Sequence, residues 1–362
     1  MHFAMAFSCY ARKPKFHIQM ISSAGPRKRI EFIDFAKGFA ILGILLFHYF
    51  RLSETVLLAK AVMFGGAGVH LFILASGFGL PLSSLATSVW PFYKRRLTRI
   101  LIPYYVFITF LFILNQFYVI YPDGTSYAYI GHIFWFKMFD ESIIGSFGGH
   151  LWFISLIIQL YLVFPLLYQI KKRIGNLFFF IVILIISVSY WFIVIMLGKE
   201  DSGVYTSFFL QYLWEFSAGM ILADLFIKKR FKFWDQNPFV LTLTSIIGIG
   251  LMGFLAVKGG RIGRELNDIP AAIGYTSFAA LSYLIATKYI QPMIRAFLYI
   301  GKFSYELYLT HVFVAIVLSR YLFHSTDLTI SFMESLIIIP FAMLVATIYH
   351  QALHPLMQRV RS

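Results

Sequence analysis

The sequence predicts an all-α membrane protein, a polytopic bundle of about ten transmembrane helices with both termini on the cytoplasmic side (N-in/C-in). Of its 362 residues, 59% are hydrophobic and only 13% are charged. A soluble domain of this length cannot bury that much apolar surface, whereas lipid tails solvate apolar side chains directly. The aromatic share of 19% agrees with a membrane protein, because Tyr and Trp favour the interface between lipid and water.

Ten apolar runs are long enough to form the predicted spans. Each is close to the ~20 residues with which a helix crosses a ~30 Å hydrocarbon core. The runs are 33–52, 62–84, 101–120, 149–168, 176–197, 205–226, 239–257, 270–287, 299–320 and 330–350. The chain therefore divides into a cytoplasmic lead-in at 1–29, a transmembrane domain at 30–355 and a cytoplasmic tail at 356–362.

The basic residues predict the orientation of these spans. With the amino terminus inside, 22 of the 31 Lys and Arg residues lie inside or at inner ends of spans, eight lie outside, and Lys37 lies within the first span. The opposite orientation reverses that ratio, so the positive-inside rule favours the first. The net charge of +15 comes from short clusters between apolar runs and not from one basic face, so no nucleic-acid binding is predicted.

Several function classes lack their sequence signals. Cys9 is the single cysteine, which excludes internal disulfides and a thiolate metal site. The His-Glu-x-x-His zinc pattern is absent, and no metal is predicted. The chain also has no P-loop and no dinucleotide-binding glycine fingerprint, so neither nucleotide hydrolysis nor hydride transfer is indicated.

The first span holds ionisable side chains where lipid should be, which makes each a candidate functional residue. Lys37 and His48 are eleven residues apart. Eleven steps of 100° place them on one helix face, about 16 Å apart along the axis. Asp34 precedes Lys37 by three positions and can neutralise it. His48 suits proton transfer from a hydroxyl; the alternative is a Lys37 that reaches the inner interface and a His48 that is only a buried polar group.

The next two spans carry a small-residue stretch and a basic pair. Gly68 and Gly77, with Ser76, leave a surface that favours either close helix packing or a ligand beside the backbone. Arg96 and Arg99 project from one helix face at the inner end of the third span. Two guanidinium groups there can hold phosphate oxygens, although a plain stop-transfer cluster would look the same.

Later spans add further polar groups that could line a cavity or join helices. Trp152 lies at the outer end of the fourth span, and Glu215 is a carboxylate inside the sixth. In the ninth span Tyr308 and His311 share one face, and Tyr305 precedes them. Interhelical hydrogen bonding explains the polar set of the ninth span as well as a cavity does, and Trp152 could equally be an interface anchor.

Taken in order, these segments resemble acyltransferase family 3 of integral membrane O-acyltransferases, over about residues 28–355. The most specific piece is a basic residue, ten intervening residues and a histidine, here Lys37 to His48. Gly-Val-x-x-Phe-x-x-x-Ser-Gly at 68–77 and Arg-x-x-Arg at 96–99 follow. Weaker agreements are His-x-Trp-Phe at 150–153, Glu-Phe-x-x-Gly at 215–219 and Ser-Tyr-x-x-Tyr-x-x-His at 304–311.

The resemblance implies an acyl-CoA-dependent O-acyltransferase in a bacterial cytoplasmic membrane. Its acceptor would be a hydroxyl of a cell-surface glycan or of its lipid-linked precursor, and its donor acyl-CoA, most simply acetyl-CoA, with no metal. The implied catalytic residues are His48 and Lys37, and the implied donor-binding residues are Arg96, Arg99, Gly68, Phe72, Ser76 and Gly77.

Two features depart from the family pattern. His70 takes the place of an acidic residue found in many relatives, which leaves its role open. The sequence also carries no fused extracytoplasmic hydrolase-like domain, so a second transfer step is expected to need a separate protein. The rival interpretation is a secondary transporter of glycan or acyl groups, which would also hold polar residues inside its spans.

Overall fold

The computed structural model describes residues 30–51, 56–83, 89–231, 236–324 and 330–361. Within these ranges the chain forms helices and no strand, which confirms the all-α prediction. The predicted lead-in at 1–29 lies outside the described residues.

The elements follow the chain in a simple order. The α-helices are α1 (Glu31–Phe50), α2 (Val56–Met63), α3 (Gly68–Ser83), α4 (Val89–Phe117), α5 (Ser126–Ile133), α6 (Trp152–Ile174), α7 (Asn176–Leu197), α8 (Gly203–Thr206), α9 (Phe209–Ile227), α10 (Pro238–Lys258), α11 (Gly260–Leu266), α12 (Asp268–Tyr289), α13 (Gln291–Lys302), α14 (Ser304–Tyr321) and α15 (Phe332–Arg361). Three 3₁₀ turns join them: η1 (Phe64–Ala67), η2 (Phe136–Phe139) and η3 (Gly149–Leu151).

Eight helical segments of the described chain are long and apolar enough to cross a membrane. The other two predicted spans, 205–226 and 299–320, form α9 and α14, which have 19 and 18 residues. These two helices are not among the eight. Both contain ionisable residues in their buried sets, such as Glu215 in α9 and His311 in α14, and such residues lower hydropathy. The eight long apolar segments support an integral membrane protein built as a bundle of helices.

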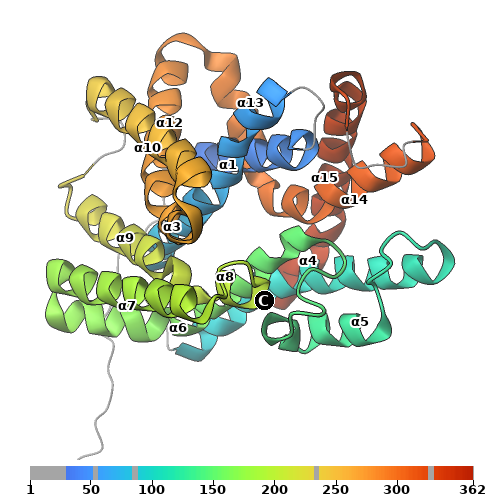
Figure 1. Ribbon diagram of the computed structural model, residues 1–362, viewed down its shortest axis with the longest axis horizontal. Helices are drawn as coiled ribbons and strands as arrows, with labels where there is room; N and C mark the ends of the chain where they lie inside the picture. Colours follow the sequence, from blue (N-terminus) through green and yellow to red (C-terminus); the bar gives the residue numbers. More distant parts are fainter. Residues whose placement is uncertain (1–29, 52–55, 84–88, 232–235, 325–329, 362) are drawn as a thin grey trace, which may run out of the picture.

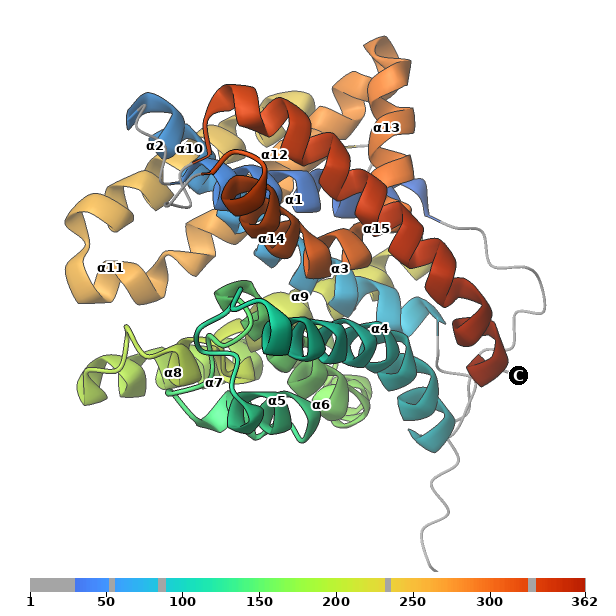
Figure 2. The same ribbon diagram turned by 90° about the vertical axis from the view of Figure 1, so that its right-hand side faces the viewer.

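Burial separates central helices from peripheral ones. Two thirds (67%) of the apolar window in Gly149–Ile174 and 56% of that in α1 are buried, against 17% for α10 and 22% for α7. In Figure 1 α1 and α3 run through the middle of the molecule, with α10 and α12 on one side and α6 and α7 on another. Figure 2 shows α15 crossing the outside of the bundle next to α14. The peripheral helices present their apolar side chains to lipid.

The bundle has two chemically different ends. We call the end at which α1, α4 and α14 finish and α6 begins the pocket end. The other end, which we call the basic end, carries the basic clusters 94–99 in α4, 171–173 in α6 and 228–230 after α9.

Candidate functional site

A pocket of about 820 Å³ opens at the pocket end. Side chains from α1, the segment 118–148, the start of α6 and the end of α14 line it. The polar and aromatic residues used below are His48, Arg51, Asp123, His150, Trp152 and Arg320. Residues far apart in the sequence therefore share one cavity.

Three imidazole rings meet beside this pocket, one each from α1, η3 and α14. The ring centroid of His311 lies 5.1 Å from that of His48 and 5.1 Å from that of His150. The centroids of His48 and His150 are 6.1 Å apart. Across the described ranges, no group of three or more His, Cys, Asp and Glu side chains is arranged to hold a metal ion. Neutral imidazole rings at these distances can exchange protons and form hydrogen bonds with one another.

Backbone carbonyls decide which nitrogen of His311 carries the proton. Its Nδ1 lies 3.0 Å from the carbonyl oxygen of Leu307 and 2.8 Å from that of Tyr308. Carbonyl oxygens only accept, so Nδ1–H donates, and Nε2 of the neutral ring keeps its lone pair. That Nε2 lies 3.2 Å from Nδ1 of His48 and can accept a hydrogen bond from it.

The same reasoning leaves one nitrogen of His48 free for chemistry. Nδ1 of His48 is also 2.9 Å from the carbonyl oxygen of Ile44, one turn earlier in α1. With two acceptors beside Nδ1, the proton belongs there, and the lone pair belongs to Nε2. Within the described parts of the chain Nε2 has no hydrogen-bond partner, and the ring lines the pocket.

His150 offers a second unused lone pair. Its Nε2 donates to the carbonyl oxygen of Leu309 at 3.4 Å, while the buried Nδ1 has no hydrogen-bond partner among the described residues. Gly148 makes room for this ring: its φ of +116° is a glycine conformation, and a Cβ there would lie 2.8 Å from the imidazole. The Tyr308 hydroxyl donates to the carbonyl oxygen of His150, which ties α14 to η3.

The segment 118–148, part of which lines the pocket, also contains two buried titratable groups. His132 contacts the Tyr104 hydroxyl at 2.6 Å and the Ser146 hydroxyl at 2.9 Å, and burial holds the pKa of His132 well below its usual value. Lys137 is completely buried, and burial lowers the pKa of its ammonium to about 7 although Asp123 favours the charge.

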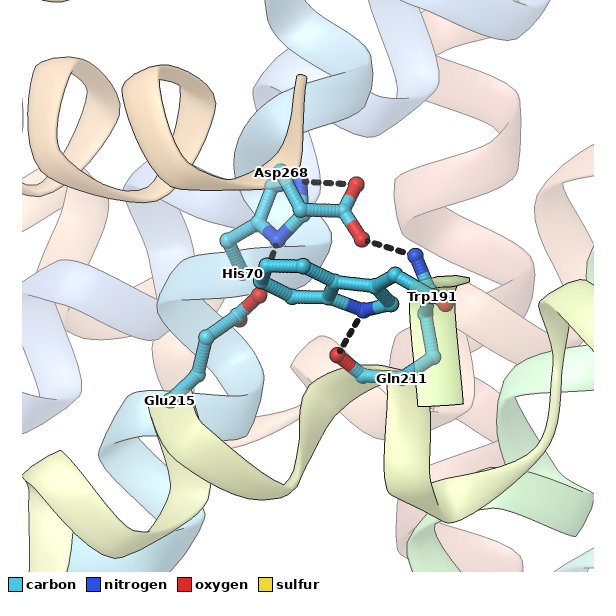
Figure 3. Close-up of polar contacts among 5 residues, drawn as sticks. All are labelled: His70, Trp191, Gln211, Glu215 and Asp268. Carbon is cyan, nitrogen blue, oxygen red and sulfur yellow. Dashed lines mark hydrogen bonds and ion pairs between the residues drawn. The ribbon is translucent and has the colours of Figure 1, made fainter. Parts of the chain in front are cut away.

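A second polar cluster joins α3, α9 and α12 (Figure 3). Nδ1 of His70 lies 2.9 Å from Oε1 of Glu215, and Nε2 lies 3.7 Å from Oδ1 of Asp268. The side-chain amide of Gln211 donates to the other oxygen of Asp268 at 2.8 Å, and the Trp191 indole donates to the backbone carbonyl oxygen of Gln211 at 3.2 Å. An imidazole between two carboxylates is held in position as a hydrogen-bond donor and not as a free base.

An aromatic stack connects this cluster to the pocket. The rings of Trp152 and Tyr212 are stacked with centroids 5.7 Å apart, and the Tyr212 ring lies 6.1 Å from that of His70. Trp152 itself lines the pocket. The Tyr212 ring thus links the pocket-lining Trp152 to His70.

The structure does not bring the other sequence candidates to the pocket. Lys37 is half-buried in α1 and Asp34 is buried near the same end of that helix. Arg96 and Arg99 lie on α4 at the basic end, where Arg99 is exposed. The Tyr305 hydroxyl donates to a backbone carbonyl of α4 at 2.9 Å, which is an interhelical role.

Gly68 and Gly77 of α3 lie where neighbouring helices pack closely. A Cβ on Gly68 would lie 2.6 Å from the carbonyl oxygen of Ala40, and one on Gly77 would lie 2.0 Å from that of Phe216. Both are therefore places where neighbouring backbones touch, the packing alternative raised above. Phe72 lies with its ring centroid 6.1 Å from that of Phe153, and Ser76 is half-buried.

Several residues of the site were not among the sequence candidates. They are Arg51, Asp123, Lys137, His150 and Arg320. His150 appeared only as part of a motif. Three of these residues are basic, namely Arg51, Lys137 and Arg320. They belong to the eight Lys and Arg residues that the predicted orientation places outside, where such residues are few. Basic residues on the side where Lys and Arg are otherwise scarce were therefore a signal of a functional site in the sequence.

Comparison with known proteins agrees with the resemblance. O-acetyltransferase OatA of Staphylococcus aureus (strain NCTC 8325 / PS 47) is 28% identical over 325 residues, which cover 80% of this chain and 51% of that protein. Putative O-acetyltransferase SACOL0978 of S. aureus (strain COL) is 28% identical over 316 residues, covering 77% and 49%. The chain thus spans about half the length of these relatives. No solved structure matches the chain.

The family assignment rests on a match that covers most of the sequence. Residues 30–350 fit the family model described as an acyltransferase domain, and this range contains His48, His150 and His311 as well as the cluster around His70. The chain therefore belongs to acyltransferase family 3.

Proposed function

We propose that the protein is a membrane O-acyltransferase that moves an acyl group, most simply acetyl, from acyl-CoA to a hydroxyl of a glycan. The acceptor would be a cell-surface glycan or its lipid-linked precursor, in a bacterial cytoplasmic membrane. The family membership and the names of the S. aureus relatives support this class of reaction. The observation that carries it is the free Nε2 of His48 at a pocket large enough for a sugar.

His48 would act as the general base. Its Nε2 takes the proton of the acceptor hydroxyl while the oxygen attacks the thioester carbonyl carbon. The carbon–sulfur bond then breaks, and the sulfur leaves with that proton as the free thiol of coenzyme A. His311 positions the base, because it accepts from Nδ1 of His48 and so keeps the reactive lone pair on the pocket side.

The unpartnered lone pair of His150 allows a second reaction mechanism. His150 Nδ1 is also unpartnered within the described chain, so either imidazole can receive a proton. Direct transfer and transfer through an acyl-imidazole both fit this geometry. Isolation of an acylated peptide after a donor-only incubation would distinguish them.

The donor would enter from the basic end. Arg96 and Arg99 share a face of α4 there, and guanidinium groups suit the phosphates of coenzyme A. Replacement of Arg96 by Ala should raise the apparent KM for the donor more than it lowers kcat.

The test is a His48→Gln variant at matched membrane expression. We expect acceptor-dependent release of coenzyme A thiol, and the mass of acylated acceptor, to fall by about 100-fold or more. His354→Gln is the matched control, since His354 is an exposed histidine of α15 away from the pocket. Unchanged activity in His48→Gln would refute the base. If the wild-type protein releases no thiol with any acceptor, the transporter interpretation gains support instead.

A further inference from the structure

Basic side chains gather at the pocket although they are scarce at this end of the bundle. The predicted orientation places only eight of the 31 Lys and Arg residues on this side. Arg51 and Arg320 line the pocket, and Lys137 lies in the segment 118–148, part of which lines it. By contrast Arg261, at the same end, binds Glu200 away from the pocket.

The two arginines are held in place with donors to spare. The guanidinium of Arg51 lies 5.7 Å from the centroid of the Phe47 ring. Nη1 of Arg320 donates to the carbonyl oxygen of Val119 at 2.8 Å. A guanidinium has five N–H donors, so each of these contacts orients its exposed side chain and leaves further N–H groups that suit an oxyanion.

Lys137 adds a buried amine, which carries a positive charge when it is protonated. The side chain is 0% exposed, and its Nζ contacts no acceptor in the described part of the chain. When protonated, Lys137 is favoured by the carboxylate of Asp123 and disfavours protonation of His150, and both of these residues line the pocket. An unpaired ammonium in the interior is costly unless a negative charge comes near.

The balance of charge in the pocket is therefore positive. The lining holds two guanidinium groups, those of Arg51 and Arg320, and one carboxylate, that of Asp123, and the amine of Lys137 is buried in the segment 118–148. Trp152 and Tyr121 supply flat apolar faces in the same cavity. This combination suits a sugar that carries an acidic group.

We propose that the acceptor is an anionic glycan, whose carboxylate or phosphate binds between Arg51 and Arg320 while its hydroxyl meets His48. This inference rests on the proposed O-acyltransferase activity and specifies its substrate class. The shared chemistry is an oxyanion, which a uronic acid or a sugar phosphate would supply equally.

The experiment uses the full chain in proteoliposomes with acetyl-CoA and three acceptors. These are a glucuronic acid oligosaccharide, the same oligosaccharide with its carboxyl groups reduced to alcohols, and a neutral sugar on a polyprenyl phosphate. We expect kcat/KM for an anionic acceptor to exceed that for the neutral one by about 10-fold or more, mainly through KM. Preference for the first or the third acceptor identifies the anion as carboxylate or phosphate.

A double variant tests the residues themselves. Arg51→Gln with Arg320→Gln should remove most of the preference for the anionic acceptor, and Arg261→Gln, the matched control, should leave it intact. Equal kcat/KM for charged and neutral acceptors in the wild type would overturn the inference while leaving the acyltransferase in place. An equal loss for both acceptors in the double variant would also overturn it, because that outcome marks a structural role. Absence of transfer to every acceptor would count against the proposed function itself.

Discussion

At the scale of single residues, the site depends on which nitrogen of each imidazole holds a proton. The sequence indicated His48 and His311 as polar groups on membrane helices, but it could not show that they touch. Their contact at 3.2 Å results from the packing of α1 against α14, which no local pattern encodes. Carbonyl oxygens of α14 then set the tautomer of His311, and His311 sets that of His48.

This relay predicts different outcomes for two replacements of His311. Gln can present an acceptor oxygen near the place of the imidazole Nε2, whereas Met cannot. We expect His311→Met to lower kcat by about 10-fold or more and His311→Gln to restore a large part of it, with KM for the acceptor little changed. The measurement is acceptor-dependent thiol release; equal activity of the two variants would contradict the relay.

Lys137 gives a pH dependence of stability. Its pKa is about 7 in the folded chain and near 10.5 in the unfolded chain, so between these values the unfolded chain binds more protons. The free energy of unfolding should therefore rise with pH from about 7 to 10.5. Thermal melting in detergent across this window checks it: Lys137→Met should show a smaller rise than the wild type, and parallel curves would contradict the buried charge.

At the scale of elements, apolar length predicted the helices well and their ends less well. The predicted span 176–197 coincides with α7 (Asn176–Leu197), whereas α4 begins at Val89 instead of 101 and α15 runs to Arg361 through the predicted tail. A hydropathy window stops at charged residues, but Lys and Arg are good helix formers and the backbone continues. The amphipathic α13 and the short α5 fell below the length of a span and were missed.

Contact between α3 and α9 predicts contrasting effects of two similar substitutions. Gly77→Ala would place a Cβ 2.0 Å from the Phe216 carbonyl oxygen and force these helices apart, whereas nothing lies within 4 Å of a Cβ at Gly79. We expect Gly77→Ala to lower stability by about 1–3 kcal/mol and Gly79→Ala to leave it unchanged or slightly higher. Thermal unfolding in one detergent measures both; equal melting temperatures would refute the close packing.

At the scale of the whole molecule, eight of the ten predicted passes correspond to helical segments of the described chain that are long and apolar enough to cross a membrane, and their orientation in the membrane remains a prediction from charge. The basic end should face the cytoplasm. The residues that form the pocket could not be predicted as a group, because they come from four separate parts of the chain.

Cysteine labelling tests this orientation. With Cys9 replaced by Ser, single cysteines at Lys199 and Arg173 sample the pocket end and the basic end, and both positions are exposed. In intact cells a membrane-impermeant maleimide should label Lys199→Cys and should label Arg173→Cys only after permeabilisation. The reverse pattern would place the histidine pocket on the cytoplasmic side.

The division between buried and lipid-facing helices affects how the protein responds to the thickness of its bilayer. Hydrophobic mismatch acts on helices that touch acyl chains, here α7, α10 and α15, of whose windows only 17–22% is buried. Thinning or thickening the hydrocarbon layer would tilt these three peripheral helices first, because α1 and α6 are shielded from lipid by their neighbours. Catalytic rate should therefore vary little with lipid chain length, even where melting temperature follows it.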